Sequence, residues 1–393
     1  FQVHQPFRLR TYHFDQIGID HYYENYDQNI EILNKVADKC YLPTNAKILE
    51  LLMRHKGRFK VAFSISGVAL EQFELYRPDV IRSFQALAAT GNVEMLSETY
   101  YHSLSFNYSV EEFDRQVLMH REKIKALFGL EPAIFRNTEL IFNNDLAAHV
   151  ASLGYKGMLC EGTDRYLQTR LPNHIYSSPG ITNFSLLLKN YRLSDDIAFR
   201  FSNHEWEDWP LTADKFSEWL HKHAGNAETI NLFMDYETFG EHQWKETGIF
   251  DFLDNLPEMI LDHPDFYFRS PSEVIAAYPS RDVYDVPDFT SWADEERDLS
   301  AWKENEMQEE ALAKIYSLEK AVKATGNEDL VKVWGKLQTS DHFYYMSTKF
   351  WADGDVHKYF SPFASPYDAA TYFMNAVSDL EKTIQAMADL PST

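Results

Sequence analysis

The sequence predicts an α/β protein in which helices cover a parallel sheet, followed by a helical C-terminal region. Two observations support this fold class. Short apolar segments alternate with helical segments through the first half of the chain, the order typical of parallel α/β folds. From about residue 291 the pattern changes to long segments with apolar residues three and four positions apart, as in amphipathic helices. At 393 residues, both a barrel and an open sheet accommodate this order.

Local signals justify each element of the first half. Lys60–Ser66, Val93–Leu96 and Ala133–Arg136 are short apolar runs that favour strands. Pro78–Thr90 has helical spacing. Ser109–Phe128 has the pattern of a helix capped by its serine, with acidic residues in the first turn.

The region after about residue 291 is predicted to be helical. The three expected helices are Asp294–Thr325, Glu328–Leu337 and Tyr367–Leu390. The Pro- and Asp-rich stretch Tyr278–Phe289 is the best candidate for a boundary. We therefore expect a catalytic domain over residues 1–285 and a helical domain over residues 286–393 that contributes to the substrate cleft.

Composition limits the class of partner. Sixty acidic residues against 37 basic ones give a net charge of −23, which disfavours nucleic acid and anionic membranes but is compatible with a neutral polyol. Aromatic residues, 15% of the chain, suit large cores and can also stack on sugars. Cys40 and Cys160 are too few for a disulfide scaffold and are expected to be buried thiols.

No apolar run approaches the roughly 20 residues of a membrane span, and no signal-peptide pattern opens the chain. We therefore expect a cytoplasmic protein without a membrane partner. The chain begins at Phe1 inside an apparent strand, which leaves open whether residues precede it.

Polar side chains follow four predicted strands at the point where each strand ends. In chain order they are His4 and Gln5, Glu98 and His102, Glu139, and Asp235. In a parallel barrel the carboxyl ends of the strands meet at one mouth, where catalytic groups lie. One such carboxylate is more often a helix cap, but four polar endings together predict an active site.

Glu139 and Asp235 are the natural catalytic pair, because each lies at or just beyond the end of a short apolar strand. Cleavage of a glycosidic bond needs a proton on the leaving oxygen and electron density at the anomeric carbon. Two carboxylates, one protonated and one ionised, are the minimum equipment for both tasks.

A zinc site is the alternative chemistry, since histidine and carboxylate are suitable ligands. Its candidates are His4, His102, His204, His242 and Asp235. The sequence has no His-Glu-x-x-His motif, and its only His-x-His, at 221–223, lies in a helical stretch where residues two apart face different sides. Neither a Gly-x-Ser-x-Gly elbow nor a phosphate-binding glycine loop occurs, so no cofactor is predicted.

Four segments, in this order, resemble the motifs of glycoside hydrolase family 57, whose members are retaining amylases, glucanotransferases and branching enzymes acting on α-glucans. His4-Gln5-Pro6 resembles the first motif, Gly91–His102 the second, and Phe135–Leu140 the third, with Glu139 at the nucleophile position. Asp235–Gly240 matches the most specific motif, Asp-x-Glu-x-Phe-Gly, with Asp235 at the general acid/base position.

Thr339–Phe343 resembles the segment from which the family's helical region sends a carboxylate, here Asp341, into the cleft. Two departures make the subfamily an open question. The third motif commonly has Trp-Leu-Pro before the glutamate, where this chain has Arg136-Asn137-Thr138. The fifth motif is matched only by Ser270–Glu273.

The resemblance implies a distorted (β/α)7 barrel with a helical domain closing one side of the cleft. It also implies double displacement on an α-1,4-glucan or maltooligosaccharide, with the two carboxyl groups about 5 to 5.5 Å apart. The expected binders of sugar hydroxyls are His4, Gln5, Glu98, His102, Glu237, His242 and Asp341. The expected stacking platforms are Trp206, Trp209 and Trp244.

Three other outcomes remain open from the sequence. The same glycosyl-enzyme passes its sugar to a hydroxyl in a 4-α-glucanotransferase or branching enzyme. A metal-dependent deacetylase or mannosidase-like barrel requires a bound metal instead. A non-catalytic glucan-binding protein binds without turnover. The sequence does not predict the oligomeric state.

Overall fold

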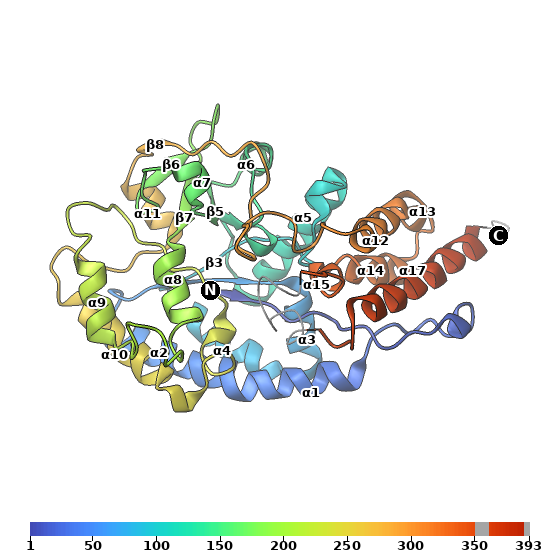
Figure 1. The fold of residues 1–393 in the computed structure, drawn as a ribbon, viewed down its shortest axis with the longest axis horizontal. Helices are drawn as coiled ribbons and strands as arrows, with labels where there is room; N and C mark the ends of the chain where they lie inside the picture. The colour runs from blue at the N-terminus through green and yellow to red at the C-terminus, as the bar shows by residue number, and fades with distance from the viewer. Residues whose placement is uncertain (350–360, 389–393) are drawn as a thin grey trace.

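The computed structural model describes residues 1–349 and 361–388, and its strands form two sheets (Figure 1). The first has the order β1-β2-β3 and the second β4-β5-β7-β6-β8. The strands are β1 Gln2–Val3, β2 Val61–Ile65, β3 Val93–Met95, β4 Ile134–Arg136, β5 Gly157–Glu161, β6 Ile175–Ser177, β7 Ser185–Lys189 and β8 Asp282–Val283. Except for the antiparallel pair β6 and β7, neighbouring strands are parallel.

Isolated bridges connect the two sheets into a ring. Ser97 bridges to Phe135 and so joins β3 to β4. Residues 231–235 fill the remaining gap, because Asn231 bridges to Lys189 at the end of β7 and Asp235 bridges to Gln2 in β1. Seven parallel segments thus surround one interior, which confirms the α/β prediction and agrees with a distorted (β/α)7 barrel. The sheet itself is not closed by continuous ladders.

Helices lie outside the barrel and continue into the C-terminal region (Figure 1). The barrel helices are α1 Tyr26–Val36, α2 Leu42–His55, α3 Gly67–Tyr76, α4 Pro78–Ala88, α5 Val110–Phe128, α6 Asn144–Ser152, α7 Asp164–Leu167, α8 Tyr191–Ala198, α9 Ala213–His221, α10 Ile249–Leu261 and α11 Pro271–Ala277. The C-terminal helices are α12 Glu306–Ser317, α13 Glu319–Ala324, α14 Glu328–Lys336, α15 Ser340–Tyr344 and α17 Pro366–Ala388. No helix in the described part of the chain is both long and apolar enough to cross a bilayer.

The expected helix signals act as the sequence indicates. Ser109 caps α5, since its side chain accepts a hydrogen bond from the backbone N–H of Glu112. The single helix expected over Asp294–Thr325 is wrong: α12 begins only at Glu306, where Asn305 forms a capping box with Gln308. The strand expected over residues 230–235 is reduced to two bridges. The end of the last predicted helix, residues 389–390, lies outside the described residues.

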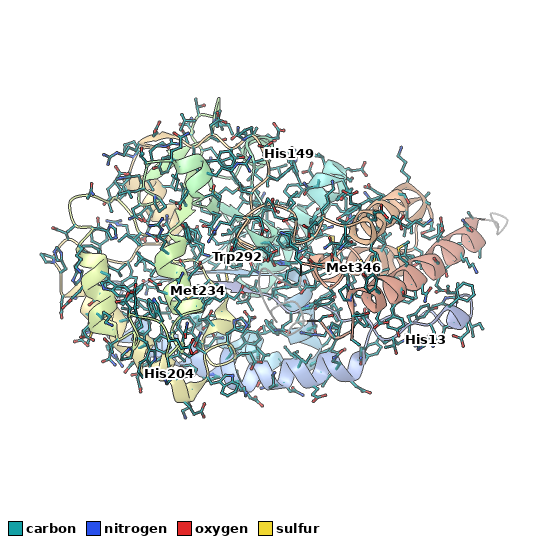
Figure 2. All side chains as sticks on the ribbon, viewed as in Figure 1. His13, His149, His204, Met234, Trp292 and Met346 are labelled. Atoms are coloured by element: carbon teal, nitrogen blue, oxygen red, sulfur yellow. The ribbon has the colours of Figure 1, made fainter. Side chains whose placement is uncertain are left out.

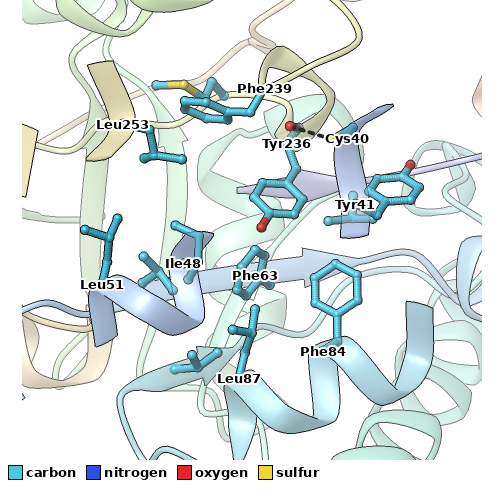
Figure 3. Close-up of a cluster of buried hydrophobic side chains, with 14 of the residues drawn as sticks. Cys40, Tyr41, Ile48, Leu51, Phe63, Phe84, Leu87, Tyr236, Phe239 and Leu253 are labelled. Carbon is cyan, nitrogen blue, oxygen red and sulfur yellow. Dashed lines mark hydrogen bonds between the residues drawn. The ribbon is translucent and has the colours of Figure 1, made fainter. Parts of the chain in front are cut away.

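Two large apolar clusters stabilise the barrel and the C-terminal helical region. The first lies between the barrel strands and helices such as α2, α4 and α10, and Figure 3 shows Tyr236 at its centre. Cys40 lies there as a buried thiol whose Sγ is 3.2 Å from the Tyr236 carbonyl oxygen, and Cys160 is also buried. The second cluster joins α12 to α17 with Leu9, Tyr12, Tyr23, Leu104 and Ile141 from the first part of the chain. The C-terminal helices therefore share a core with loops of the barrel.

Candidate active site

Each of the seven barrel segments carries a polar side chain at or just beyond its carboxyl end. In ring order these are His4, Ser66, Glu98, Glu139, Glu161, Lys189 and Asp235. Parallel pairing brings all seven ends to the same rim, because every strand runs in the same direction. The strand pairing therefore brings the polar strand ends together, as expected from the sequence.

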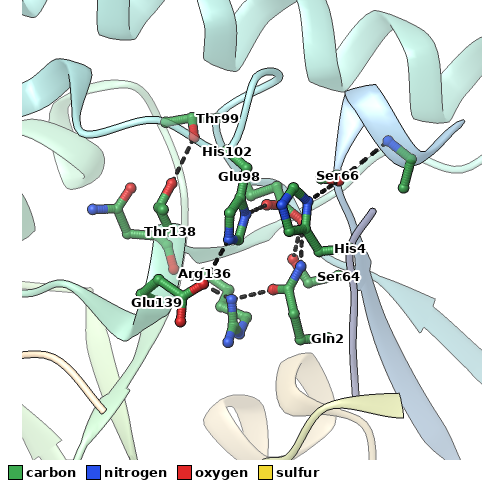
Figure 4. Close-up of polar contacts among 12 residues, drawn as sticks. Gln2, His4, Ser64, Ser66, Glu98, Thr99, His102, Arg136, Thr138 and Glu139 are labelled. Atoms are coloured by element: carbon green, nitrogen blue, oxygen red, sulfur yellow. Dashed lines mark hydrogen bonds and ion pairs between the residues drawn. The ribbon is translucent and has the colours of Figure 1, made fainter. Parts of the chain in front are cut away.

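A chain of hydrogen bonds connects Glu98, His102 and Glu139 (Figure 4). His102 Nδ1 lies 3.0 Å from Glu98 Oε2, and His102 Nε2 lies 2.8 Å from Glu139 Oε1. Glu98 Oε1 accepts further bonds from Ser64 Oγ at 2.8 Å and Gln2 Nε2 at 3.3 Å. His102 therefore has a carboxylate at both ring nitrogens, an arrangement suited to the imidazolium form.

Hydrogen bonds and nearby positive charge keep Glu98 and Glu139 ionised. Burial alone raises the pKa of Glu98, but the hydrogen bond and charge of His102 outweigh it and bring the pKa to about 2. Burial also opposes the charge on His102, yet its bonds to Glu139 and Glu98 raise the His102 pKa to about 10. Burial likewise raises the pKa of Glu139, whereas His102, the Trp292 N–H and Arg136 lower it more. Glu139 is a carboxylate at neutral pH.

Glu139 is held in an unusual conformation with its side chain 25% exposed. Its φ is 54° and that of Leu140 is 53°, so two consecutive non-glycine residues adopt the left-handed region. His102 is also left-handed, with φ 53°. Such strain concentrates at functional sites, where the surrounding structure maintains it.

The surroundings of Asp235 raise its pKa, whereas those of Glu139 lower the pKa of that residue. Burial raises the Asp235 pKa and the negative charge of Glu139 adds to the rise, against opposing contributions from His242, Arg136 and Lys189. Glu237, two residues on, has a pKa raised to about 8, first by burial and then by Asp235. The Tyr41 hydroxyl donates to Glu237 Oε1.

Gly240 allows the turn after Asp235 to lie against a neighbouring segment. Its φ is 108°, and a Cβ there would lie 2.0 Å from the Lys39 carbonyl oxygen. Only glycine fits this close approach, which gives the Phe-Gly end of the fourth motif a physical reason.

The C-terminal helices reach the rim through Asp341 at the start of α15. Asp341 Oδ2 lies 2.7 Å from His4 Nε2, and His4 Nδ1 lies 2.7 Å from Ser66 Oγ. The His4 ring stacks on His102 with centroids 3.8 Å apart. Burial raises the pKa of Asp341, but the charge and hydrogen bond of His4 outweigh it, and the pKa falls well below its usual range. Residues 337 positions apart thus meet at one rim.

Four of the expected sugar binders are buried, namely Gln5, Glu98, His102 and Glu237. Glu98 and His102 have no exposed surface, and the bonds above use both Glu98 oxygens, so their role as sugar binders stays a prediction. Gln5 is buried as well, bonding to Tyr41 through Nε2 and to Arg8 through Oε1. His4, Asp235, His242 and Asp341 retain partial exposure.

The expected stacking tryptophans contact other elements. Trp206 packs edge-on to Trp219, with centroids 6.1 Å apart. Trp209 stacks on His204, with ring centroids 4.1 Å apart. Trp244 is 60% exposed, with Lys39 Nζ 5.6 Å from its ring centroid. Ser270–Glu273, the fifth-motif candidate, caps α11 and contacts Lys60 and Glu94.

Sequence reasoning missed Trp292, which contacts the proposed nucleophile directly. Its indole Nε1 donates to Glu139 Oε2 at 2.6 Å, and its backbone N–H donates to the Glu139 carbonyl at 3.1 Å. Figure 2 shows Trp292 near the middle of the molecule. It belongs to an irregular stretch with neither strand nor helix periodicity, so no local signal marked it.

Within residues 1–349 and 361–388, no three His, Cys, Asp or Glu side chains gather in a way that could hold a metal ion. His4 and His102 point their ring nitrogens at Ser66, Asp341, Glu98 and Glu139 within 3.0 Å.

The rim of strand ends carries two carboxylates whose pKa values are shifted in opposite directions, which is the equipment that cleavage of a glycosidic bond requires. Residues 1–287 match the sequence profile of Glycosyl hydrolase family 57. The chain is also 44% identical over 400 residues to a Methanocaldococcus jannaschii protein named "Putative alpha-amylase", covering 98% of this chain and 84% of that protein. The chain belongs to glycosyl hydrolase family 57.

Solved structures share the fold at low identity. A GH57 branching enzyme from Thermococcus kodakaraensis superposes with a TM-score of 0.71 at 12% identity, covering 98% of this chain and 88% of that one. A 4-alpha-glucanotransferase from Thermococcus litoralis gives a TM-score of 0.62 at 17% identity over 80% of this chain, which spans 53% of that enzyme. These likenesses confirm the α/β fold with its helical C-terminal region and are consistent with a barrel.

Proposed function

We propose that this enzyme cleaves α-1,4-linked glucan by a retaining double displacement, with Glu139 as nucleophile and Asp235 as general acid/base. One observation carries the proposal. Burial and the negative charge of Glu139 raise the pKa of Asp235, whereas His102, the Trp292 N–H and Arg136 lower the pKa of Glu139 against its burial. Such divergence assigns the roles, because the nucleophile must be ionised while the acid must hold a proton.

In the first step, a Glu139 oxygen forms a bond to the anomeric carbon as the bond to the leaving sugar oxygen breaks. Asp235 gives its proton to that oxygen. His102 and Trp292 each donate to one oxygen of Glu139, so the carboxylate plane is fixed before substrate arrives. Arg136 and His102 keep positive charge beside the carboxylate.

In the second step, water attacks the anomeric carbon of the glycosyl-enzyme. Asp235 removes the water proton, and the bond between the sugar and Glu139 breaks, which restores both carboxyl groups. His4 and Asp341 are proposed as binders of sugar hydroxyls, since they lie at the same rim and remain partly exposed. Glu237, His242 and Trp244 extend the proposed binding surface around Asp235.

Product analysis on maltoheptaose tests the proposal. We expect shorter maltooligosaccharides from the unmodified enzyme and a loss on the order of 10³-fold or more for Glu139→Gln and Asp235→Asn. Glu74→Gln is the matched control, because Glu74 pairs with Lys123 at the surface. Azide added to Glu139→Ala should restore turnover and give a glycosyl azide of inverted anomeric configuration. Undiminished activity of Glu139→Gln would exclude the assignment.

Transfer is the second candidate, because the solved relatives include a branching enzyme and a 4-alpha-glucanotransferase. In that case a sugar hydroxyl replaces water in the second step. Products longer than maltoheptaose would identify transfer, and reducing ends that increase with time would identify hydrolysis.

A further inference from the structure

The stretch of residues 290–298, here called the Trp292 strap, crosses the rim beside the proposed nucleophile. Its first residue exchanges two backbone hydrogen bonds with Phe142, at 2.8 and 2.9 Å. Trp292 then bonds twice to Glu139, once through its backbone N–H and once through its indole. The strap therefore contacts Glu139 at both backbone and carboxylate.

Two cations lie over the Trp292 ring. The Arg136 guanidinium carbon is 4.5 Å from the ring centroid and Lys189 Nζ is 5.1 Å from it. Both cations are almost fully buried, so their attraction to the ring is weakly screened. These contacts hold the ring in place and draw electron density from the indole, which makes its N–H a stronger donor to a carboxylate.

The far end of the strap is anchored by ion pairs. Arg297 lies 3.8 Å from both Glu161 and Asp195, and its guanidinium stacks at 4.1 Å on the Tyr191 ring. Arg297 has φ 49°, a conformation that non-glycine residues rarely adopt. Its carbonyl accepts from the backbone N–H of Ser291, which closes the strap into a loop and couples Arg297 to the residue next to Trp292.

We infer that Trp292 is a positioning residue that holds the second oxygen of Glu139, opposite the oxygen held by His102, and that Arg297 sets the place of Trp292 by anchoring the strap. The inference rests on the proposed function, since it assumes that Glu139 is the nucleophile. A carboxylate held at both oxygens cannot rotate away from its line of attack. A tryptophan serving only as a sugar platform would instead act on substrate binding.

Trp292→Phe separates these roles, because phenylalanine keeps an aromatic ring but lacks the N–H. We expect kcat to fall about 10- to 100-fold while KM changes less than about threefold. The acid limb of kcat/KM should move to higher pH, because loss of a donor to the ionised form favours the protonated form of Glu139. The charged groups facing Glu139 are His102, Arg136 and Asp235, and all are retained in the variant.

Trp334→Phe is the matched control. Its indole donates to the Ile315 carbonyl at 2.8 Å in the core of the C-terminal helices. This variant should lower the melting temperature and leave the acid limb of the pH profile in place. An unchanged kcat and acid limb in Trp292→Phe, or a raised KM alone, would overturn the inference.

Arg297→Gln tests the anchor. If Arg297 acts through Trp292, the double variant Trp292→Phe/Arg297→Gln should have the same acid limb and kcat as Trp292→Phe alone. If the kcat losses of Trp292→Phe and Arg297→Gln add fully in the double variant, Arg297 does not act through Trp292, and the inference about Arg297 is refuted. Glu139→Gln in the same assay keeps the two proposals distinguishable: its full activity would end the proposed function, whereas its inactivity beside an unaltered Trp292→Phe would end only this inference.

Discussion

Neutralising Glu98 should destabilise the protein and lower the pKa of His102. Glu98 has no exposed surface, and glutamine keeps its size while removing its charge. The Glu98 pKa falls from 4.5 to about 2 in the folded protein. At about 1.4 kcal/mol per pH unit, this difference corresponds to about 3 kcal/mol of stability at neutral pH. The raised pKa of His102 reflects the same contact, so its contribution is not added.

The sign of the pH dependence follows from the lowered pKa. The Glu98 contribution is fully present above pH 4.5 and is lost as the pH falls toward about 2. The amide oxygen of Glu98→Gln still accepts a hydrogen bond from His102, so we expect a loss of about 1 to 3 kcal/mol at pH 7. Urea denaturation at pH 7 and pH 3 measures it, and the difference between variant and parent should shrink at the lower pH.

Glu161→Gln is a matched control, because Glu161 is an equally buried glutamate at the end of β5. Burial raises its pKa against the pull of Lys189 and Arg297, so its ionised form does not stabilise the fold as that of Glu98 does. NMR titration of ¹⁵N-labelled histidines should place the His102 pKa below about 10 in Glu98→Gln and leave it near the parent value in Glu161→Gln. Equal stability of Glu98→Gln and the parent at pH 7, with an unmoved His102 titration, would refute this reasoning.

Other predictions concern substrate binding, the general acid, packing and metals. Asp341→Asn removes the charged partner of the first-motif histidine and should lower kcat/KM on maltoheptaose about tenfold or more, with most of the loss in KM. Lys189→Met removes a cation that lowers the pKa of Asp235, so the basic limb of kcat/KM should move to higher pH; a limb moving to lower pH would contradict the assignment. Gly335→Ala would place a Cβ 2.3 Å from the Tyr101 ring and should cost about 1 to 3 kcal/mol in urea denaturation, partly recovered by adding Tyr101→Leu. Activity should survive exhaustive dialysis against EDTA, and its loss with recovery by zinc would favour the deacetylase-like alternative.

Local signals in the sequence are strong where one residue acts on its own neighbours. The cap of α5 by Ser109 and the strand at Val61–Ile65 are both visible from spacing and residue type, because caps and strand faces depend on residues a few positions apart. The polar strand endings are visible for the same reason. Parallel pairing then brings them together in any fold of this class.

The predictions from the sequence were wrong for segments whose structure depends on residues far away in the chain. The segment from 230 to 235 has a strand-like composition, yet it pairs only through its two ends, with Lys189 and Gln2. Residues 294–305 have helical spacing but form the end of the Trp292 strap and the turns that follow it, where Arg297 meets carboxylates from β5 and α8. Tertiary contacts override local propensity at both places.

By itself, the sequence determined the fold class, the strand ends that face one rim, and the candidate pair Glu139 and Asp235. Only the tertiary structure decided that their surroundings lower the pKa of Glu139 and raise that of Asp235, that Glu98 and His102 are buried, and that Trp292 donates to the Glu139 carboxylate. The physical reason is that a pKa and a hydrogen bond depend on burial and on atoms a few ångströms away. His102 and Trp292, which both bond to the Glu139 carboxylate, lie 37 and 153 positions away from it in the sequence.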